Sequence, residues 1–407
     1  MEIIQNFKNR FFDIEPIAKN LSFSHFLLSF GYKLFSLYFP LFLVFKGLSF
    51  QQVGYTYLLI YLPIALFAPI SAFLCSRFNS FILIILGAAG YFFYSVAMTL
   101  NVNLFAFYLF QIILGISASL FFVGSRNLLV CLAKKPDKSF GWFYSVPTYA
   151  DVLGPVVGAV LIWKFGFFGV FVFSFLIHFL NIIYSYKYLK NFNVSKQSEI
   201  EDFSKIKSDY FSIFRKLAEK KILIMVILVF LVMFLTGFYR AFFILFVKNI
   251  LNWQQDKILL FVSLNSLIFI PVSWWIIKII GKQKSRTNIL QGTFIKGLMT
   301  LILGLGFRFF DFTSLMALEI IKGSGALMIG SGKSGFFVKK FKRFSQEISA
   351  IDTFITTFSV SIGSLLGGFL LKYFHFSTIF QWFGFALIIL TLFIIFIDKR
   401  AENSEAT

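Results

Sequence analysis

The chain has 407 residues, of which 58% are hydrophobic and only 14% are charged. Soluble domains carry about 25% charged residues, and a soluble core could not bury so much apolar surface, so the composition excludes an ordinary soluble fold. The formal net charge of +20 first suggests nucleic acid, but the positions of these charges, described below, indicate a membrane instead.

Apolar runs long enough to cross a bilayer follow one another along the chain. A hydrocarbon core of about 30 Å needs roughly 20 apolar residues in a helix, and the runs lack the strict alternation of barrel strands. The sequence therefore predicts an all-α membrane protein with twelve transmembrane helices. The predicted spans are 21–45, 54–76, 81–100, 103–125, 140–163, 166–186, 222–247, 257–280, 288–306, 312–337, 347–371 and 376–397.

A polar segment between the sixth and seventh spans divides the chain into two halves. Apolar residues in it, such as Ile200, Phe203 and Leu217, recur near helical spacing and predict an amphipathic helix on the inner leaflet; a flexible linker is the alternative. The predicted parts are an N-terminal six-helix bundle (1–186), a cytoplasmic linker (187–221), a C-terminal six-helix bundle (222–398) and a cytoplasmic tail (399–407).

The two halves resemble each other in sequence. KGLSFQQ at 46–52 recurs as KNILNWQQ at 248–255, and GPVVGAVL at 154–161 is echoed by GSLLGGFL at 363–370. The matches keep their order and occur at corresponding positions, so an internal duplication explains them. We therefore expect the twelve helices to form two pseudo-symmetric six-helix bundles.

The basic residues fix the expected orientation. Most of the 38 lysines and arginines fall in the termini and in every second loop, which by the positive-inside rule are cytoplasmic. The sequence predicts a multi-pass protein of the plasma (inner) membrane with cytoplasmic N- and C-termini. The expected partners are anionic lipids on the cytoplasmic side and no nucleic acid, and a monomer is expected.

One motif in the fifth span resembles a known family. YADVLGPVVGA at 149–159 resembles the G-x-x-x-G-P-x-x-G motif of major facilitator superfamily transporters, especially the drug and metabolite antiporter branch, with Ala150 at the first glycine. Gly154 and Gly158 lie one turn apart and allow close helix packing, while Pro155 bends the span. We expect this face to pack against the opposite bundle.

Other motifs of the superfamily are represented less completely. Gly363 and Gly367 repeat the glycine pair in the second half. In SAFLCSRFNS at 71–80 only Leu74 and Arg77 match the family's gating loop between helices two and three. In helix four the family signature is represented by Gln111, Leu114 and Gly115 without its arginine, which weakens a proton antiport interpretation.

The resemblance implies which charged and polar residues face the substrate. Helices one, four, seven and ten surround a central cavity in the superfamily, so Lys33, Gln111, Arg240, Glu319 and Lys322 are expected to line it, between the two bundles. The cavity would be net basic and would favour an anionic or zwitterionic solute.

Two structural alternatives remain open for these charges. Asp151 could pair with Lys33, and Glu319 and Lys322 could neutralise each other at i, i+3. His25, at the start of helix one, could titrate near neutral pH and take part in coupling. Elsewhere, His178 is interpreted as a core or lipid-edge residue, and Lys296 and Asp352 as helix anchors or snorkelling side chains.

The predicted function is secondary active transport of a small solute by alternating access, the solute being an organic anion or zwitterionic metabolite. The chain has three histidines and no cluster of acid, base and nucleophile, so we expect neither an enzyme nor a metal or cofactor site; coupling to an H⁺ or Na⁺ gradient is the expected energy source. The alternatives are a proton-coupled exporter of cationic drugs and a non-transporting protein on the same scaffold.

Overall fold

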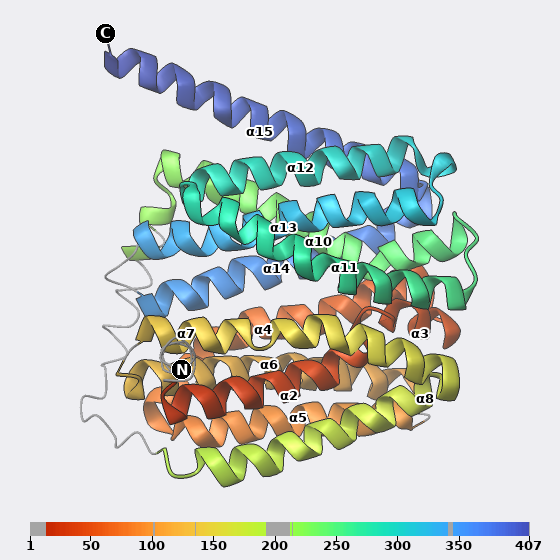
Figure 1. Cartoon of the computed structure of the whole chain (residues 1–407), viewed down its shortest axis with the longest axis vertical. Helices are drawn as coiled ribbons and strands as arrows, with labels where there is room; N and C mark the ends of the chain where they lie inside the picture. The colour runs from red at the N-terminus through yellow and green to blue at the C-terminus, as the bar shows by residue number, and fades with distance from the viewer. Residues whose placement is uncertain are drawn as a thin grey trace, which may run out of the picture. The chain divides into compact units, whose positions relative to one another are not determined.

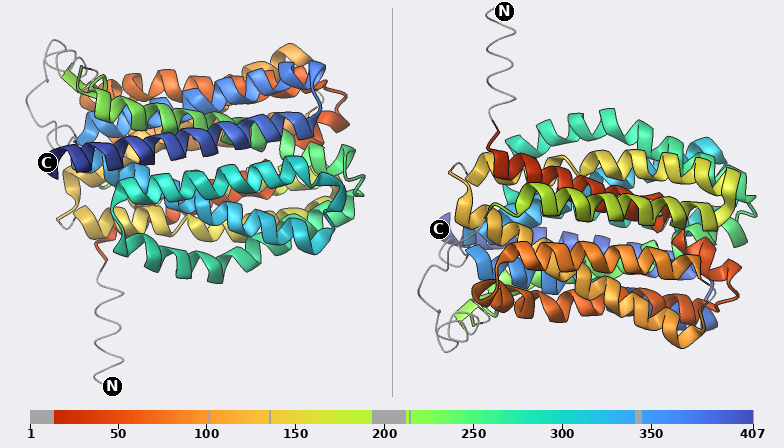
Figure 2. Two further views of the ribbon diagram at one scale, coloured as in Figure 1. Left: turned by 90° about the horizontal axis from the view of Figure 1, so that it is seen from above. Right: turned by 90° about the horizontal axis from the view of Figure 1, so that it is seen from below.

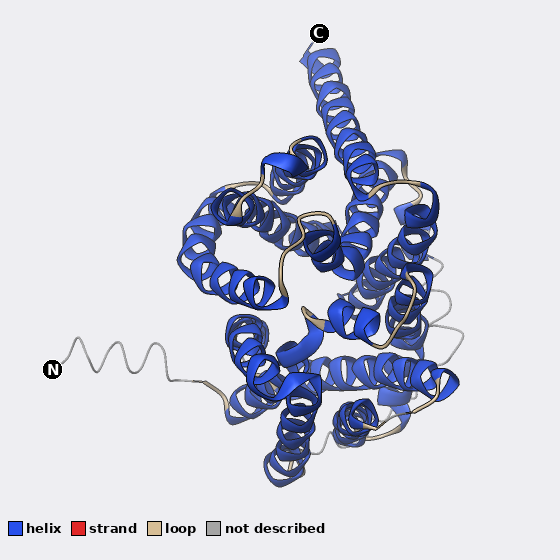
Figure 3. Ribbon diagram, turned by 90° about the vertical axis from the view of Figure 1, so that its right-hand side faces the viewer, coloured by secondary structure: helices blue, strands red, loops and turns tan. Residues whose placement is uncertain are grey.

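The structure, a computed structural model, describes residues 14–100, 102–134, 136–192, 212–213, 215–340 and 345–406. Across these residues the chain forms helices and no strand (Figure 3), which confirms the predicted all-α class. The amphipathic helix predicted in the linker falls mainly on 193–211, outside the described residues.

The chain divides into two compact units according to its internal contacts. Unit 1 contains Met1–Leu37 and Leu66–Glu201, and unit 2 contains Tyr38–Ala65 and Asp202–Thr407. The predicted boundaries of two six-helix bundles stay a prediction.

Unit 1 is built from five helices and the second part of a sixth (Figure 1). In it, α2 packs along α8, and α5 packs against both α6 and α8. The helices are α2 (Pro16–Ser36), α4 (Phe50–Arg77, in unit 1 from Leu66), α5 (Ser80–Thr99), α6 (Leu104–Leu132), α7 (Pro136–Ser145) and α8 (Thr148–Leu189).

Unit 2 holds the first part of α4, to Ala65, and the remaining helices. In it, α12 lies alongside α13 and α15 (Figure 2), and α10 packs on α14. The helices are α3 (Phe39–Phe45), α10 (Lys220–Asn249), α11 (Gln255–Lys282), α12 (Ser285–Leu305), the short 3₁₀ helix η1 (Phe307–Phe309), α13 (Phe312–Lys340), α14 (Ser345–Tyr373) and α15 (Phe376–Ala406).

Twelve candidate membrane spans can be counted within the described residues. Ten helices are long and apolar enough to cross a bilayer, and α2 with α3 forms an eleventh span that is bent by 46°. The candidate Ser139–Leu189 has 51 residues and is interrupted at Gly166, whose φ of 66° is readily adopted only by glycine. Two spans therefore meet at Gly166, as the sequence predicted.

Glycines bring helices of one unit into direct backbone contact. A Cβ atom added at Gly158 would meet the carbonyl oxygen of Leu34 in α2, and one added at Gly154 would meet the side chain of Lys33. In unit 2, Gly363 lies in the same way against the backbone of Phe234 in α10. The expectation that the glycines of helix five pack on the opposite bundle was wrong, because their neighbour is α2 of the same unit.

Several helices begin at side chains that accept or exchange backbone hydrogen bonds. Asn79 caps α5, with Oδ1 accepting from the amide of Phe81 at 3.0 Å. Asp311 and Ser314 form a reciprocal capping box before α13, in which each backbone amide donates to the other side chain. These hydrogen bonds from Ser314 lower the pKa of the exposed Asp311 carboxyl below its usual value.

The second part of α8 presents a buried polar seam to its neighbours, formed by Ser174, His178, Asn181 and Ser185. Ser174 donates to the carbonyl oxygen of Gly31 at 2.8 Å and lies 3.0 Å from Ser95. Ser24 of α2 lies 2.9 Å from Asn181 Oδ1 and 2.7 Å from Ser185 Oγ.

His178 occupies the space that the missing side chain of Gly31 leaves. Its ring lies across that of Tyr91, with 5.4 Å between the centroids. This location confirms the interpretation of His178 as a core residue. Hydrogen bonds between small polar side chains, such as those of Ser24, Asn181 and Ser185, join helices within the bilayer.

Candidate functional site

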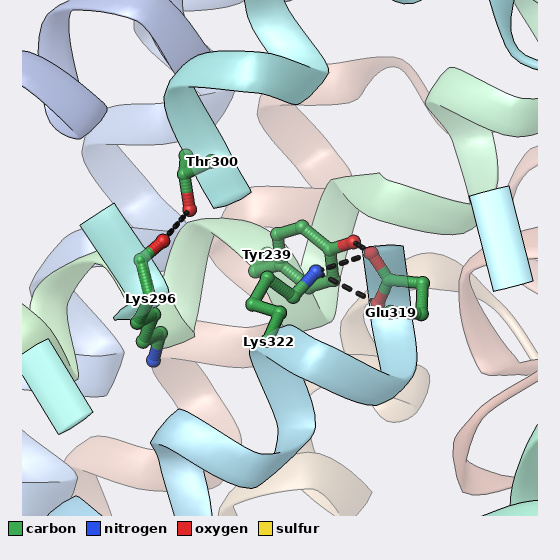
Figure 4. Close-up of polar contacts among 5 residues, drawn as sticks. All are labelled: Tyr239, Lys296, Thr300, Glu319 and Lys322. Atoms are coloured by element: carbon green, nitrogen blue, oxygen red, sulfur yellow. Dashed lines mark hydrogen bonds and ion pairs between the residues drawn. The ribbon is translucent and has the colours of Figure 1, made fainter. Parts of the chain in front are cut away.

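A buried ion pair forms the centre of the candidate site in unit 2. Lys322 Nζ lies 2.5 Å and 2.7 Å from the two carboxylate oxygens of Glu319, one turn away on α13, and the side chains are 7% and 9% exposed. The hydroxyl of Tyr239 on α10 donates to the same carboxylate (Figure 4). The i, i+3 pairing that the sequence left as one alternative is therefore present.

Aromatic rings complete the surroundings of the Lys322 ammonium. Its nitrogen lies 3.1 Å from the ring centroid of Tyr239 and 4.9 Å from that of Phe243. Ring faces carry negative charge density and attract cations. A charge inside a membrane span is costly unless it is paired, and Lys322 gains a carboxylate and two rings.

Arg240 follows Tyr239 directly on α10 and is exposed. A guanidinium nitrogen donates to the hydroxyl of Tyr61 at 2.9 Å, and the guanidinium carbon lies 5.7 Å from the Tyr61 ring centroid. Tyr61 lies in the part of α4 that belongs to unit 2. Arg240 stands nine residues before the end of α10, or about 13 Å along the axis, and an exposed arginine at such a depth normally contacts water rather than lipid.

Lys296 adds a third basic side chain to unit 2. Its side chain is buried on α12, with Nζ 2.5 Å from Thr236 Oγ1 and 3.5 Å from the carbonyl oxygen of Val232, both on α10. Among the described residues no carboxylate forms an ion pair with Lys296, and its hydrogen bonds to α10 agree with the anchor interpretation. Figure 4 shows Lys296 on a different helix from Glu319 and Lys322.

We call Tyr239, Arg240, Lys296, Glu319 and Lys322 the basic cluster. Three of its side chains are basic and one is acidic. In a low-dielectric interior such an excess of one sign favours a ligand of the opposite sign.

A second ion pair of unit 2 is partly buried and balanced by itself. Lys333 of α13 lies 2.8 Å from Asp352 of α14 and 2.6 Å from the hydroxyl of Thr356. It joins two helices and adds no net charge, as expected for the anchor predicted at Asp352.

Unit 1 places the other predicted charges at α2 and α8. Lys33 Nζ lies 2.6 Å from Asp151, with 32% and 53% of the two side chains exposed. The pairing that the sequence left open is therefore formed. Both side chains are partly exposed, so water screens part of their interaction.

Two further predicted residues of unit 1 are buried and hydrogen-bonded. Gln111 accepts from the hydroxyl of Tyr94 at 3.1 Å and donates to the carbonyl oxygen of Phe107 at 3.2 Å. His25 is bonded to the carbonyl oxygen of Phe143 at 3.0 Å. Both belong to unit 1, whereas the basic cluster belongs to unit 2, and a role for either in transport stays a prediction.

The predicted gating residues have structural neighbours within their own units. Arg77 is exposed at the end of α4 and covers the ring of Phe73, 4.9 Å from its centroid. Gly367 lies against the rings of Phe238 and Phe242, and Pro155 follows Gly154 on the face of α8 described above. Within the described residues no group of three or more His, Cys, Asp or Glu side chains could hold a metal ion.

Sequence reasoning missed the uncharged partners of the site. The sequence does not single out Tyr239 and Thr236, because tyrosine and threonine are common in spans. The signal that could have found Tyr239 is its place beside Arg240 on a predicted cavity helix.

The sequence matches the Major Facilitator Superfamily over residues 21–338. The chain belongs to this superfamily. It is a multi-pass membrane protein of a transporter family rather than an enzyme, and the resemblance seen in the fifth span is confirmed. The antiporter branch stays a prediction. A search of the curated proteins gave no match.

Solved structures of POT family transporters share the fold of this superfamily member. One, in complex with a thioalcohol-conjugated peptide, has 16% identity and a TM-score of 0.77, covering 94% of this chain and 96% of the other. Another, in complex with 5-aminolevulinic acid, has 16% identity and a TM-score of 0.75 with the same coverage. A peptide transporter POT in complex with sulfate has 15% identity, a TM-score of 0.73 and 96% coverage of both chains.

Proposed function

We propose that this protein is a secondary active transporter that moves a small anionic or zwitterionic solute across the plasma membrane by alternating access. The basic cluster of unit 2 binds the acidic group of the solute. An H⁺ or Na⁺ gradient supplies the energy.

The observation that carries the proposal is the charge balance of the basic cluster. The cluster contains three basic side chains, those of Arg240, Lys296 and Lys322, and one carboxylate, that of Glu319, which already pairs with Lys322. A carboxylate or phosphate of the solute would balance the remaining positive charge. Arginine suits this contact because its planar fork of donors matches two oxygens of such a group.

The same cluster argues against a cationic drug as the solute. A carboxylate beside aromatic rings is a typical cation site, and here Glu319, Tyr239 and Phe243 form one. The ammonium of Lys322 already occupies it, 3.1 Å from the Tyr239 ring centroid.

Two of the similar structures contain ligands of the proposed kind. One peptide transporter is in complex with sulfate and one POT family transporter with 5-aminolevulinic acid. Both ligands carry an acidic group, which supports the choice of an anionic or zwitterionic solute for the first screen.

The test is a thermal-shift screen of the purified full-length protein in detergent. The probes are sulfate, succinate, a dipeptide and 5-aminolevulinic acid, with tetraphenylphosphonium as the organic cation. We expect at least one acidic probe to stabilise the protein, because a ligand that binds only the folded state raises its stability. Arg240→Gln and Lys296→Gln should each weaken the response roughly tenfold or more in concentration, since a hydrogen bond to a charged group contributes about 1.5–3 kcal/mol.

The matched control is Lys278→Gln. Lys278 is a lysine of α11 whose side chain is exposed, so its neutralisation should leave the response unchanged. Stabilisation by tetraphenylphosphonium alone, unaffected by Arg240→Gln, would contradict the proposal and favour the cationic drug exporter.

A further inference from the structure

The fifth span is interrupted inside unit 1 by a proline. Helix α7 ends at Ser145, α8 begins at Thr148, and Val146 and Pro147 form the turn between them. A helical carbonyl accepts from the amide four residues later, but proline has no amide hydrogen. The carbonyl oxygen of Phe143 therefore cannot receive its helical hydrogen bond from residue 147.

A histidine of another helix supplies the missing donor. His25 Nδ1 on α2 lies 3.0 Å from the carbonyl oxygen of Phe143. A carbonyl can only accept, so Nδ1 carries the hydrogen. The rings of Phe122 and Phe143 lie 5.0 Å and 4.5 Å from the imidazole and fix its orientation, and both His25 and Phe143 are buried.

The same two segments meet again on the far side of the break. Lys33 of α2 pairs with Asp151 in the first turn of α8 at 2.6 Å. His25 and Lys33 are eight residues apart on α2, which is about 12 Å along the helix. Phe143 and Asp151 are also eight residues apart, with the turn at 146–147 between them. Helix α2 thus contacts the end of α7 through His25 and the start of α8 through Lys33.

We propose that His25 is a positioning residue for the Lys33–Asp151 pair: by replacing the donor that Pro147 lacks, it holds the break in the fifth span at one geometry and so keeps Asp151 on Lys33. The importance of this pair for solute movement rests on the proposed function. The hydrogen bond from His25 to the carbonyl oxygen of Phe143, in place of the amide that Pro147 lacks, does not rest on it.

The role of His25 can be tested by restoring a backbone amide donor at residue 147. His25→Phe keeps a ring among the phenylalanines and removes the donor, whereas Pro147→Ala restores an amide at residue 147. The measurement is hydrogen exchange, followed by mass spectrometry, of segment 140–152 in the purified full-length protein. It reports the amides of Val146, Ala150 and Asp151, which bond to Trp142 and Pro147.

In His25→Phe we expect these amides to exchange roughly tenfold faster, because a buried carbonyl without a partner weakens the local structure. In the double variant with Pro147→Ala, exchange should return to within about threefold of the wild type. His25→Asn, which retains a donor at similar reach, should exchange like the wild type even if the smaller side chain lowers Tm.

Pro155→Ala is the matched control. It also restores an amide to the same span, but at a position whose helical acceptor is Asp151, so it should not rescue His25→Phe. Equal rescue by Pro155→Ala, or exchange in the Pro147→Ala double variant as fast as in His25→Phe alone, would overturn the proposal. A failed ligand screen with intact rescue by Pro147→Ala would reject only the proposed transport function.

Discussion

Lys322 is held on two sides, by the carboxylate of Glu319 and by the ring of Tyr239. Both charged side chains are nearly inaccessible, so neither can replace a lost partner with water. Lys33 and Asp151 form an equally short pair, but about a third and a half of their side chains are exposed. The two pairs therefore differ in burial rather than in distance, and we expect burial to set how much free energy of unfolding is lost when one partner is removed.

Removing one partner of the buried pair should be far more damaging than removing both. We expect Glu319→Gln to lower the free energy of unfolding by about 3–5 kcal/mol, because it leaves a buried ammonium without its counter-charge. Adding Lys322→Met should recover a large part of this loss. Chemical unfolding of the single and double variants in the same detergent measures both effects.

Asp151→Asn at the exposed pair is the comparison, with an expected loss of about 1 kcal/mol or less. Equal losses from Glu319→Gln and Asp151→Asn would show that burial does not govern these pairs.

The close approach of α8 to α2 depends on glycine at the contact. A Cβ atom at Gly158 would overlap the carbonyl oxygen of Leu34, and a backbone carbonyl has no rotamer with which to move away. Any side chain there must therefore displace one of the two helices.

We expect Gly158→Leu to insert into the membrane but to lower Tm, since overpacking of a tight contact costs about 1–3 kcal/mol or more. It should also reduce the response to any probe found in the ligand screen. Gly141→Leu on α7 is the control, because nothing lies within 4 Å of a Cβ atom at that position. A Gly158→Leu protein as stable as Gly141→Leu would show that the contact between α2 and α8 accommodates a side chain at residue 158 without a loss of stability.

At the level of elements, the spans were predictable because bilayer thickness sets their length and excludes polar residues from them. The breaks were harder to foresee. The turn at Leu37–Tyr38, where α2 and α3 bend by 46°, and the turn at Val146–Pro147 both lie inside runs that read as continuous. Pro40 and Pro147 were visible signals, but a proline can also be tolerated inside a membrane helix.

The candidate site was predictable only in part for a related reason. Spacing within one helix gives Glu319–Lys322, since residues three apart share a face. The contact of Lys296 with Thr236 joins two helices and depends on how each is rotated about its axis. The spacing of residues within either helix does not determine how the two helices are rotated against each other.

At the scale of the whole molecule, a TM-score of 0.77 accompanies only 16% identity to a solved transporter. The bilayer explains how a similar fold can accompany so low an identity, because any apolar segment of suitable length satisfies the main requirement of a span. The fold therefore does not identify the solute, which the side chains of the site must define.

The orientation in the membrane is open to a direct test. After Cys75 and Cys131 are replaced by serine, single cysteines in 187–221 and 399–407 should react with a membrane-impermeant reagent only after the cells are opened, because the positive-inside rule places both segments in the cytoplasm. A cysteine at Arg308, in a predicted external loop, should react in intact cells. Labelling of either cytoplasmic segment from outside would reverse the predicted topology.

The polar seam of α8 has a consequence for the order in which unit 1 is assembled. Ser174 and Asn181 belong to the sixth span, and their hydrogen-bond partners Ser95, Gly31 and Ser24 belong to the third and first. A ribosome delivers those two earlier spans first, so the polar side chains of the sixth enter a bilayer that already holds their partners. Vectorial synthesis thus reduces the time for which these groups are exposed to lipid without a partner.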